Sequence, residues 1–160
     1  MERIDAIIGH EKFRACLEAN KAAEADRCFC CHNMEHFLDV ARIGMLINLE
    51  DELGISKELV YAAALLHDIG KYVQYAEGVP HEIASARLAS DILEDCGFDE
   101  KETDVIIDAI VHHRDKKVKE EGNLRGLLYR ADKWSRACYA CKAAEECNWP
   151  DTKKNLQVRY

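Results

Sequence analysis

Helix-breaking residues are scarce in this chain. Its 160 residues include only two prolines and eight glycines, and its apolar residues recur at helical spacing. Proline and glycine interrupt helices, whereas apolar residues at this spacing line one face of a helix. A chain of this length fits one domain with a substantial core. We therefore predict an all-α fold, a helical bundle that forms a single domain over residues 1–160.

Long hydrophobic segments are also missing. No apolar run approaches the roughly 20 residues that a membrane-spanning helix requires. The first residues, Met1–Asp5, are not followed by the apolar core and cleavage site of a signal peptide. From these two features we expect a cytoplasmic protein with no membrane partner. We accordingly expect its eight cysteines to be reduced thiols and not a disulfide framework.

Positive charge is in deficit, since 22 lysines and arginines face 30 acidic residues and the formal net charge is −8. A dedicated nucleic-acid-binding protein normally presents a basic face. We therefore expect no nucleic-acid partner. A small phosphorylated substrate is still compatible with this charge, because a bound metal ion supplies positive charge locally.

A histidine and an aspartate stand side by side at the end of the apolar segment Ala62–Lys71, which reads AAALLHDIGK. Burying two such polar residues is costly unless a charged group lies between them. A divalent metal ion is the simplest such group. An earlier histidine, His36, lies on the apolar stripe of its own predicted helix, so we expect it to point into the core.

The order His36, His67-Asp68, Asp132 resembles the ligand pattern of the HD superfamily of metal-dependent phosphohydrolases. The run from His67 to Lys71 matches the signature of that family, and the likeness covers about residues 30–140. The resemblance implies an HD-type helical bundle with its core in this range, a helical N-terminal segment and a short C-terminal tail. It also implies that metal-activated water hydrolyses a small phosphorylated compound, of which a nucleotide is the leading example.

Two further histidines extend this pattern. Two-metal members of the superfamily, such as symmetrical diadenosine tetraphosphate hydrolases and HD-GYP phosphodiesterases, carry two more histidines between the His-Asp pair and the last aspartate. His81 and His113 stand at corresponding positions, with His112 as the alternative to His113. The resemblance therefore implies two divalent ions held by His36, His67, Asp68, His81, His113 and Asp132. No Gly-Tyr-Pro motif follows His113, which weighs against a cyclic-dinucleotide substrate.

The type of donor and the neighbouring residues suggest how such a site would act. Histidines and carboxylates without thiolates favour iron or manganese, with zinc and nickel as alternatives. Asp68 and Lys71 are the predicted catalytic residues: Asp68 would bridge the ions, and Lys71 would contact a substrate phosphate unless it is simply a solvated lysine. Arg42 and Arg130 are weaker candidates that could pair with surface carboxylates. His32 could join the site, support it, or lie at the surface.

Capping residues delimit the expected helices. Asn33, Ser56, Asp99 and Asn123 each precede an apolar periodic segment, and Pro80 opens another. The predicted elements are an amphipathic segment with one helical face over residues 2–20, helices over 34–53, 57–68, 81–96 and 100–113, and a last helix from 124 that continues through Cys138 and Cys141. Residues 72–80 are predicted to form a loop and a candidate lid over the site.

Six cysteines fall into two groups, Cys28/Cys30/Cys31 and Cys138/Cys141/Cys147. If the two ends of the domain meet, three or four thiolates could hold zinc or an iron–sulfur cluster. Cysteine is also a common small core residue, so packing is the alternative to metal binding. The sequence leaves both interpretations open.

Three functions are compatible with these features. The first is the metal-dependent phosphohydrolase described above. The second is an HD-type diiron oxygenase, which uses the same types of ligand. The third is a non-catalytic module that senses a nucleotide or a metal, which the intact ligand set disfavours. The oligomeric state, including a homodimer, is left open.

Overall fold

The computed structural model describes all 160 residues, and they form helices and turns without a β-strand. The prediction of an all-α bundle is confirmed. The α-helices are α1 (Glu2–Gly9), α2 (Glu11–Ala23), α3 (Met34–Glu50), α4 (Lys57–Leu66), α5 (Lys71–Glu77), α6 (His81–Asp95), α7 (Glu100–His112) and α8 (Leu124–Trp134). A short 3₁₀ turn at Lys116–Val118 lies between α7 and α8, and two more, at Cys138–Ala140 and Asp151–Lys153, follow α8. None of these helices combines the length and the apolar character needed to cross a membrane.

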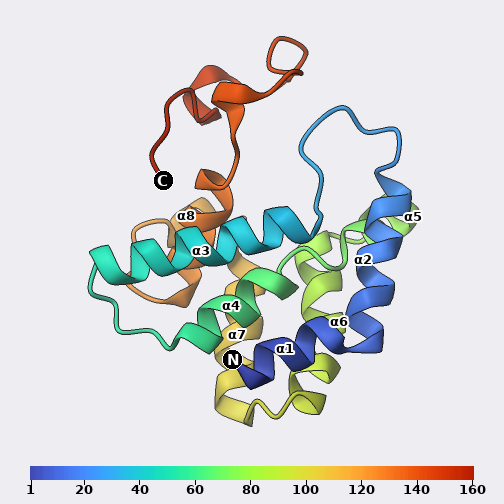
Figure 1. Cartoon of the computed structure of the whole chain (residues 1–160), viewed down its shortest axis with the longest axis vertical. Helices are drawn as coiled ribbons and strands as arrows, with labels where there is room; N and C mark the ends of the chain where they lie inside the picture. The colour runs from blue at the N-terminus through green and yellow to red at the C-terminus, as the bar shows by residue number, and fades with distance from the viewer.

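Helix α4 occupies the middle of the bundle and packs against α1, α3, α6, α7 and α8 (Figure 1). Every residue from Ala62 to Ile69 is buried. Small residues allow this close packing: a Cβ atom at Gly44 of α3 would lie 3.0 Å from Val60 of α4. The His67-Asp68 pair therefore emerges from α4 inside the protein and not at its surface.

Three of the predicted N-terminal caps make the expected hydrogen bonds. The side chains of Asn33 and Asn123 accept from the backbone N–H groups of His36 and Gly126. Asp99 and Glu102 form a reciprocal capping box at the start of α7. Ser56 begins α4 without a side-chain cap.

The N-terminal segment is two helices and not one. His10 is extended, with φ −67° and ψ 132°, and separates α1 from α2. Its Nδ1 accepts from the Lys12 N–H at 3.2 Å, which satisfies a free donor at the start of α2. Both helices still present their apolar residues to one core, where Ile4, Ile7 and Phe13 are buried.

The prediction of a loop over residues 72–80 is wrong, because most of this segment is helix α5. The helix ends at Gly78, whose φ of 73° is the left-handed conformation of a helix stop. The preceding Gly70 is required by a close approach to α6, since a Cβ atom there would lie 2.5 Å from the backbone N of Ser85. Gly70 N–H donates to Ser85 Oγ at 2.9 Å, so this segment is anchored to α6.

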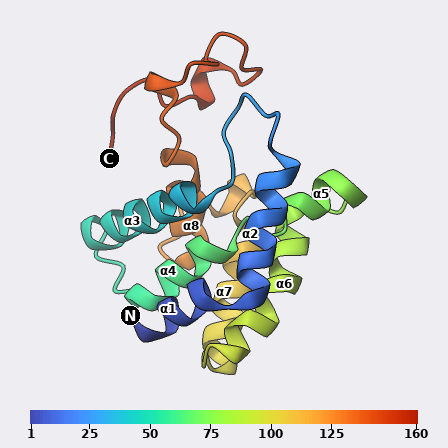
Figure 2. The same ribbon diagram turned by 45° about the vertical axis from the view of Figure 1, so that its right-hand side comes forward.

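The last helix is also shorter than predicted. It ends at Trp134, and Cys138 lies in a 3₁₀ turn beyond it, so Cys138 and Cys141 do not share a face of α8. The chain from residue 135 to 160 folds over one end of the bundle, beside the loop between α2 and α3 (Figures 1 and 2). Tyr160 stacks on Trp134 with ring centroids 5.4 Å apart.

Candidate metal centre

Five helices converge on the His-Asp pair and bring all six predicted ligand residues together. His36 lies in the first turn of α3, His81 begins α6, Asp132 is in α8, and His113 follows α7 directly. All of them are buried except His36, which is half-buried. Potential ligands 96 residues apart in the chain, His36 and Asp132, thus approach to 3.7 Å between Nε2 and Oδ1.

The potential ligands form two groups that share Asp68. Asp68 Oδ2 lies 3.3 Å from His67 Nε2 and 3.9 Å from His36 Nε2. Its other oxygen, Oδ1, lies 3.0 Å from His81 Nε2 and 3.5 Å from His113 Nε2. One carboxylate therefore presents a different oxygen to each pair of histidines.

Backbone carbonyls fix the orientation of the two most buried histidines. His67 Nδ1 donates to the Ala64 carbonyl at 2.7 Å, and His113 Nδ1 donates to the Ile110 carbonyl at 2.6 Å. These hydrogen bonds turn Nε2 of each ring toward Asp68. The same outer hydrogen bond is typical of histidines that bind metal ions.

Two of the inward-facing nitrogens have no hydrogen-bond partner in the protein. His36 Nε2 and His67 Nε2 are both buried and unpaired. Buried polar atoms are nearly always paired, because desolvating an unpaired one is costly. A cation between these nitrogens and the neighbouring carboxylates would satisfy them, so the residues present fit a metal ion.

The buried charges shift the pKa values of these groups in different directions. Burial lowers the pKa of His36 to about 4, and the neighbouring His67 adds to the effect. Burial also acts to lower the pKa of His67, but Asp68 and Asp132 outweigh it and raise that pKa to about 10. Burial acts to raise the pKa of Asp68, but His67 and its other histidine neighbours hold it well below its usual range.

His32 lies in the centre and not at the surface. Its Nε2 is 3.5 Å from Asp68 Oδ2, and its backbone N–H donates to Glu24 Oε2 at 2.7 Å. Glu24 is buried and also accepts from the Tyr75 hydroxyl at 2.8 Å. Glu24 had no sequence signal, because it stands among charged and alanine residues that read as a solvated stretch.

Of the remaining candidate residues, only Lys71 lies beside the metal centre. Lys71 Nζ lies 3.2 Å from His81 Nδ1, beside the centre. His112 is half-buried and turned toward Asp108, so His113 is the one that faces Asp68. Arg42 and Arg130 pair with Asp39 and Asp51, away from the centre.

Three further supporting residues were missed from the sequence. Asn20 of α2 is fully buried; its Nδ2 donates to the Asp68 carbonyl at 2.9 Å and its Oδ1 accepts from Tyr72 N–H at 2.8 Å. Lys133 and Arg136 both approach Asp132 Oδ2, with Arg136 at 3.6 Å. They leave Asp132 Oδ1 facing the histidines, so one oxygen is held by cations and the other is available to a metal.

Comparison with known proteins places the chain in a family. Residues 33–142 match the family model described as HD domain. An uncharacterized protein of Clostridium beijerinckii is 49% identical over 160 residues, the full length of both chains. Ribonuclease Y of Mycoplasma mycoides subsp. mycoides SC is 31% identical over 114 residues, which are 71% of this chain but only 18% of that protein.

A second ribonuclease Y also matches the chain over a small part of its own length. Ribonuclease Y of Lawsonia intracellularis is 34% identical over 100 residues, or 62% of this chain and 17% of that protein. No solved structure matches the chain. The matched range contains His36, the His67-Asp68 pair and Asp132, which are the residues that the helices bring together. The chain belongs to the HD domain family, whose members are generally metal-dependent hydrolases.

Proposed function

We propose that the protein is a metal-dependent phosphohydrolase that uses two divalent ions. The arrangement of Asp68 is the observation that carries this proposal. Its Oδ2 faces His36 and His67, and its Oδ1 faces His81 and His113. A carboxylate placed in this way is suited to bridge two ions, with Asp132 completing the first group.

The donor set suggests the metals and the chemistry. Histidine nitrogens with carboxylate oxygens and no thiolate favour iron or manganese. Two divalent ions would lower the pKa of bound water and so supply hydroxide as the nucleophile that attacks a phosphate. They would also stabilise the charge on the transferred phosphoryl group. Lys71 lies beside His81 and is half-buried, so we assign it to contact with a substrate phosphate.

A small phosphorylated compound is the proposed substrate class, with nucleotides as the first members to test. The ribonuclease Y relatives make an RNA phosphodiester the main alternative. The net charge of −8 disfavours binding of a long polyanion. The shared segment is also less than a fifth of each of those proteins.

Metal content per chain after anaerobic purification tests the two-ion site. We expect His81→Ala to hold one metal ion fewer than the wild type, because that change removes a ligand from one group only. His112→Ala is the matched control, since His112 is the neighbouring histidine that faces away from Asp68, and it should keep both ions. The same metal content in all three proteins would contradict the dinuclear site.

Activity is tested by phosphate release from a panel of nucleotides, sugar phosphates and short RNAs without oxygen. We expect turnover by the wild type that is lost in Asp68→Ala and reduced in Lys71→Met. Oxygen consumption with no phosphate release would identify an oxygenase instead. Tight nucleotide binding without any turnover would identify a sensor.

A further inference from the structure

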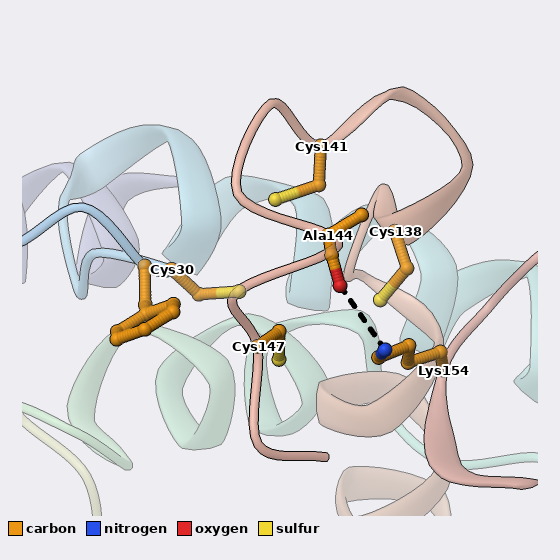
Figure 3. A pocket seen from close by; sticks show the side chains of 7 residues that line it. Cys30, Cys138, Cys141, Ala144, Cys147 and Lys154 are labelled. Carbon is orange, nitrogen blue, oxygen red and sulfur yellow. Dashed lines mark hydrogen bonds between the residues drawn. The ribbon is translucent and has the colours of Figure 1, made fainter. Parts of the chain in front are cut away.

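A second cluster of potential ligands lies outside the His-Asp centre. Cys30, from the loop between α2 and α3, meets Cys138, Cys141 and Cys147, from the segment after α8, around a cavity of about 30 Å³ (Figure 3). In Figure 3 the four cysteines surround Ala144, with Cys30 on one side, Cys138 on the other, Cys141 above and Cys147 below. Segments more than 100 residues apart in the chain thus supply four thiols to one place.

Core packing does not explain these cysteines. Cys16 and Cys96 are buried and serve that purpose, whereas Cys30 is exposed and the other three are half-buried. All four are free thiols. Four thiols gathered at a partly open position, where they add little to the core, indicate a ligand site.

Positive side chains accompany the cluster. Lys154 lines the same cavity, where its Nζ donates to the Ala144 carbonyl at 3.1 Å. The Arg136 guanidinium lies 4.0 Å from the ring centroid of Trp149, and its charge favours the thiolate form of Cys30. Although Cys30 is exposed as a whole residue, desolvation of its thiol at the cavity raises its pKa, with Cys138 and Cys141 adding to the rise. A metal would displace these thiol protons, and the two cations would offset the charge of four thiolates.

The spacing of the sulfur atoms distinguishes between two kinds of centre. Tetrahedral zinc with Zn–S bonds of about 2.3 Å holds its sulfur atoms roughly 3.8 Å apart. No three of these four sulfur atoms lie within 4.8 Å of one another. A four-iron cluster lies between its thiolates and holds them farther apart than one ion does. We propose that Cys30, Cys138, Cys141 and Cys147 ligate a [4Fe–4S] cluster.

Such a cluster would join the C-terminal segment to the metal centre through two short connections. Cys30 lies two residues before His32, whose Nε2 is 3.5 Å from Asp68. Arg136, two residues before Cys138, places its Nη2 3.6 Å from Asp132 Oδ2. The cluster would thus fix the loop that carries His32 and the segment that carries Arg136.

The test is acid-labile sulfide per chain after anaerobic purification, because sulfide is specific to the cluster and iron alone could come from the His-Asp centre. We expect about four sulfides in the wild type, and background levels in Cys30→Ser and Cys141→Ser. Cys28→Ser is the matched control: Cys28 lies in the same loop, is exposed, and does not line the cavity. It should keep its full sulfide.

A spectrum of the wild type keeps the proposal testable even where a variant fails to fold. We expect the broad visible absorption of an iron–sulfur cluster, bleached by dithionite, and a paramagnetic signal from the reduced protein. Zinc without sulfide in the wild type would overturn the cluster assignment. Anaerobic protein with neither sulfide nor zinc would overturn the site itself, and full sulfide in a folded Cys141→Ser would overturn these ligands.

Discussion

Replacing Asn20 by alanine tests how the His-Asp turn is held. Asn20 joins both sides of that turn, because it donates to the Asp68 carbonyl at 2.9 Å and accepts from Tyr72 N–H at 2.8 Å. The residue is fully buried, so water does not replace its side chain without rearrangement. Asn20→Ala would leave the Asp68 carbonyl and the Tyr72 N–H unpaired. At about 1–3 kcal/mol for each group, we expect a loss of roughly 2–6 kcal/mol in unfolding free energy.

Asn48 provides the matched control. It makes the same pair of hydrogen bonds to Ile55, donating to the carbonyl at 2.8 Å and accepting from the N–H at 3.0 Å. It lies 12 positions after His36 on α3, or about 18 Å along the helix at about 1.5 Å per residue. We expect Asn48→Ala to lower stability as well, but only Asn20→Ala to weaken metal binding, because only Asn20 positions Asp68.

Two assays separate these effects. Urea unfolding with excess chelator gives the stability of the metal-free protein, and competition with a chromophoric chelator gives the metal affinity. The reasoning would be refuted if Asn20→Ala stayed within about 0.5 kcal/mol of the wild type, as ordinary surface changes do. It would also be refuted if both variants bound metal equally well.

Three further predictions concern the turn, the histidine charges and the metal itself. Gly70→Ala places a Cβ 2.5 Å from the Ser85 backbone N, so we expect a loss of about 1–3 kcal/mol in urea unfolding. Gly9→Ala, where the nearest atom is 3.7 Å away, should be tolerated, and equal stability of the two variants would contradict the close approach. Metal binding at about pH 7 should release about one proton, because His67 has its pKa raised to about 10 while His36, at about 4, is already neutral. The affinity for metal should therefore rise with pH. If the binding enthalpy measured by titration calorimetry does not change with the ionisation enthalpy of the buffer, no proton is released and this prediction is contradicted. Removal of metal by a chelator should lower the Tm, since the ions bind only the folded protein, and a Tm insensitive to chelator would count against a resident metal.

The sequence by itself determined the helices and the order of the ligands. Caps such as Asn33, Asp99 and Asn123 and apolar residues at helical spacing act over a few residues, so they can be read locally. The His67-Asp68 pair at the end of an apolar helix likewise signals its chemistry through the cost of burying it. The same local rules failed for α5 and for the end of α8. There, contacts with Asn20, with α6 and within the C-terminal segment decide the conformation.

Only the tertiary structure decided which residues that are far apart in the sequence lie together in the folded protein. Asp68 presents one oxygen to each histidine pair because five helices converge there, and no local pattern specifies that convergence. Asn20 and Glu24 stand in a polar stretch, and only packing against α5 and the loop before α3 buries them. Cys30 joins the C-terminal cysteines for the same reason. Helices form from contacts between near neighbours, whereas a site is assembled by long-range packing of side chains that the sequence keeps far apart.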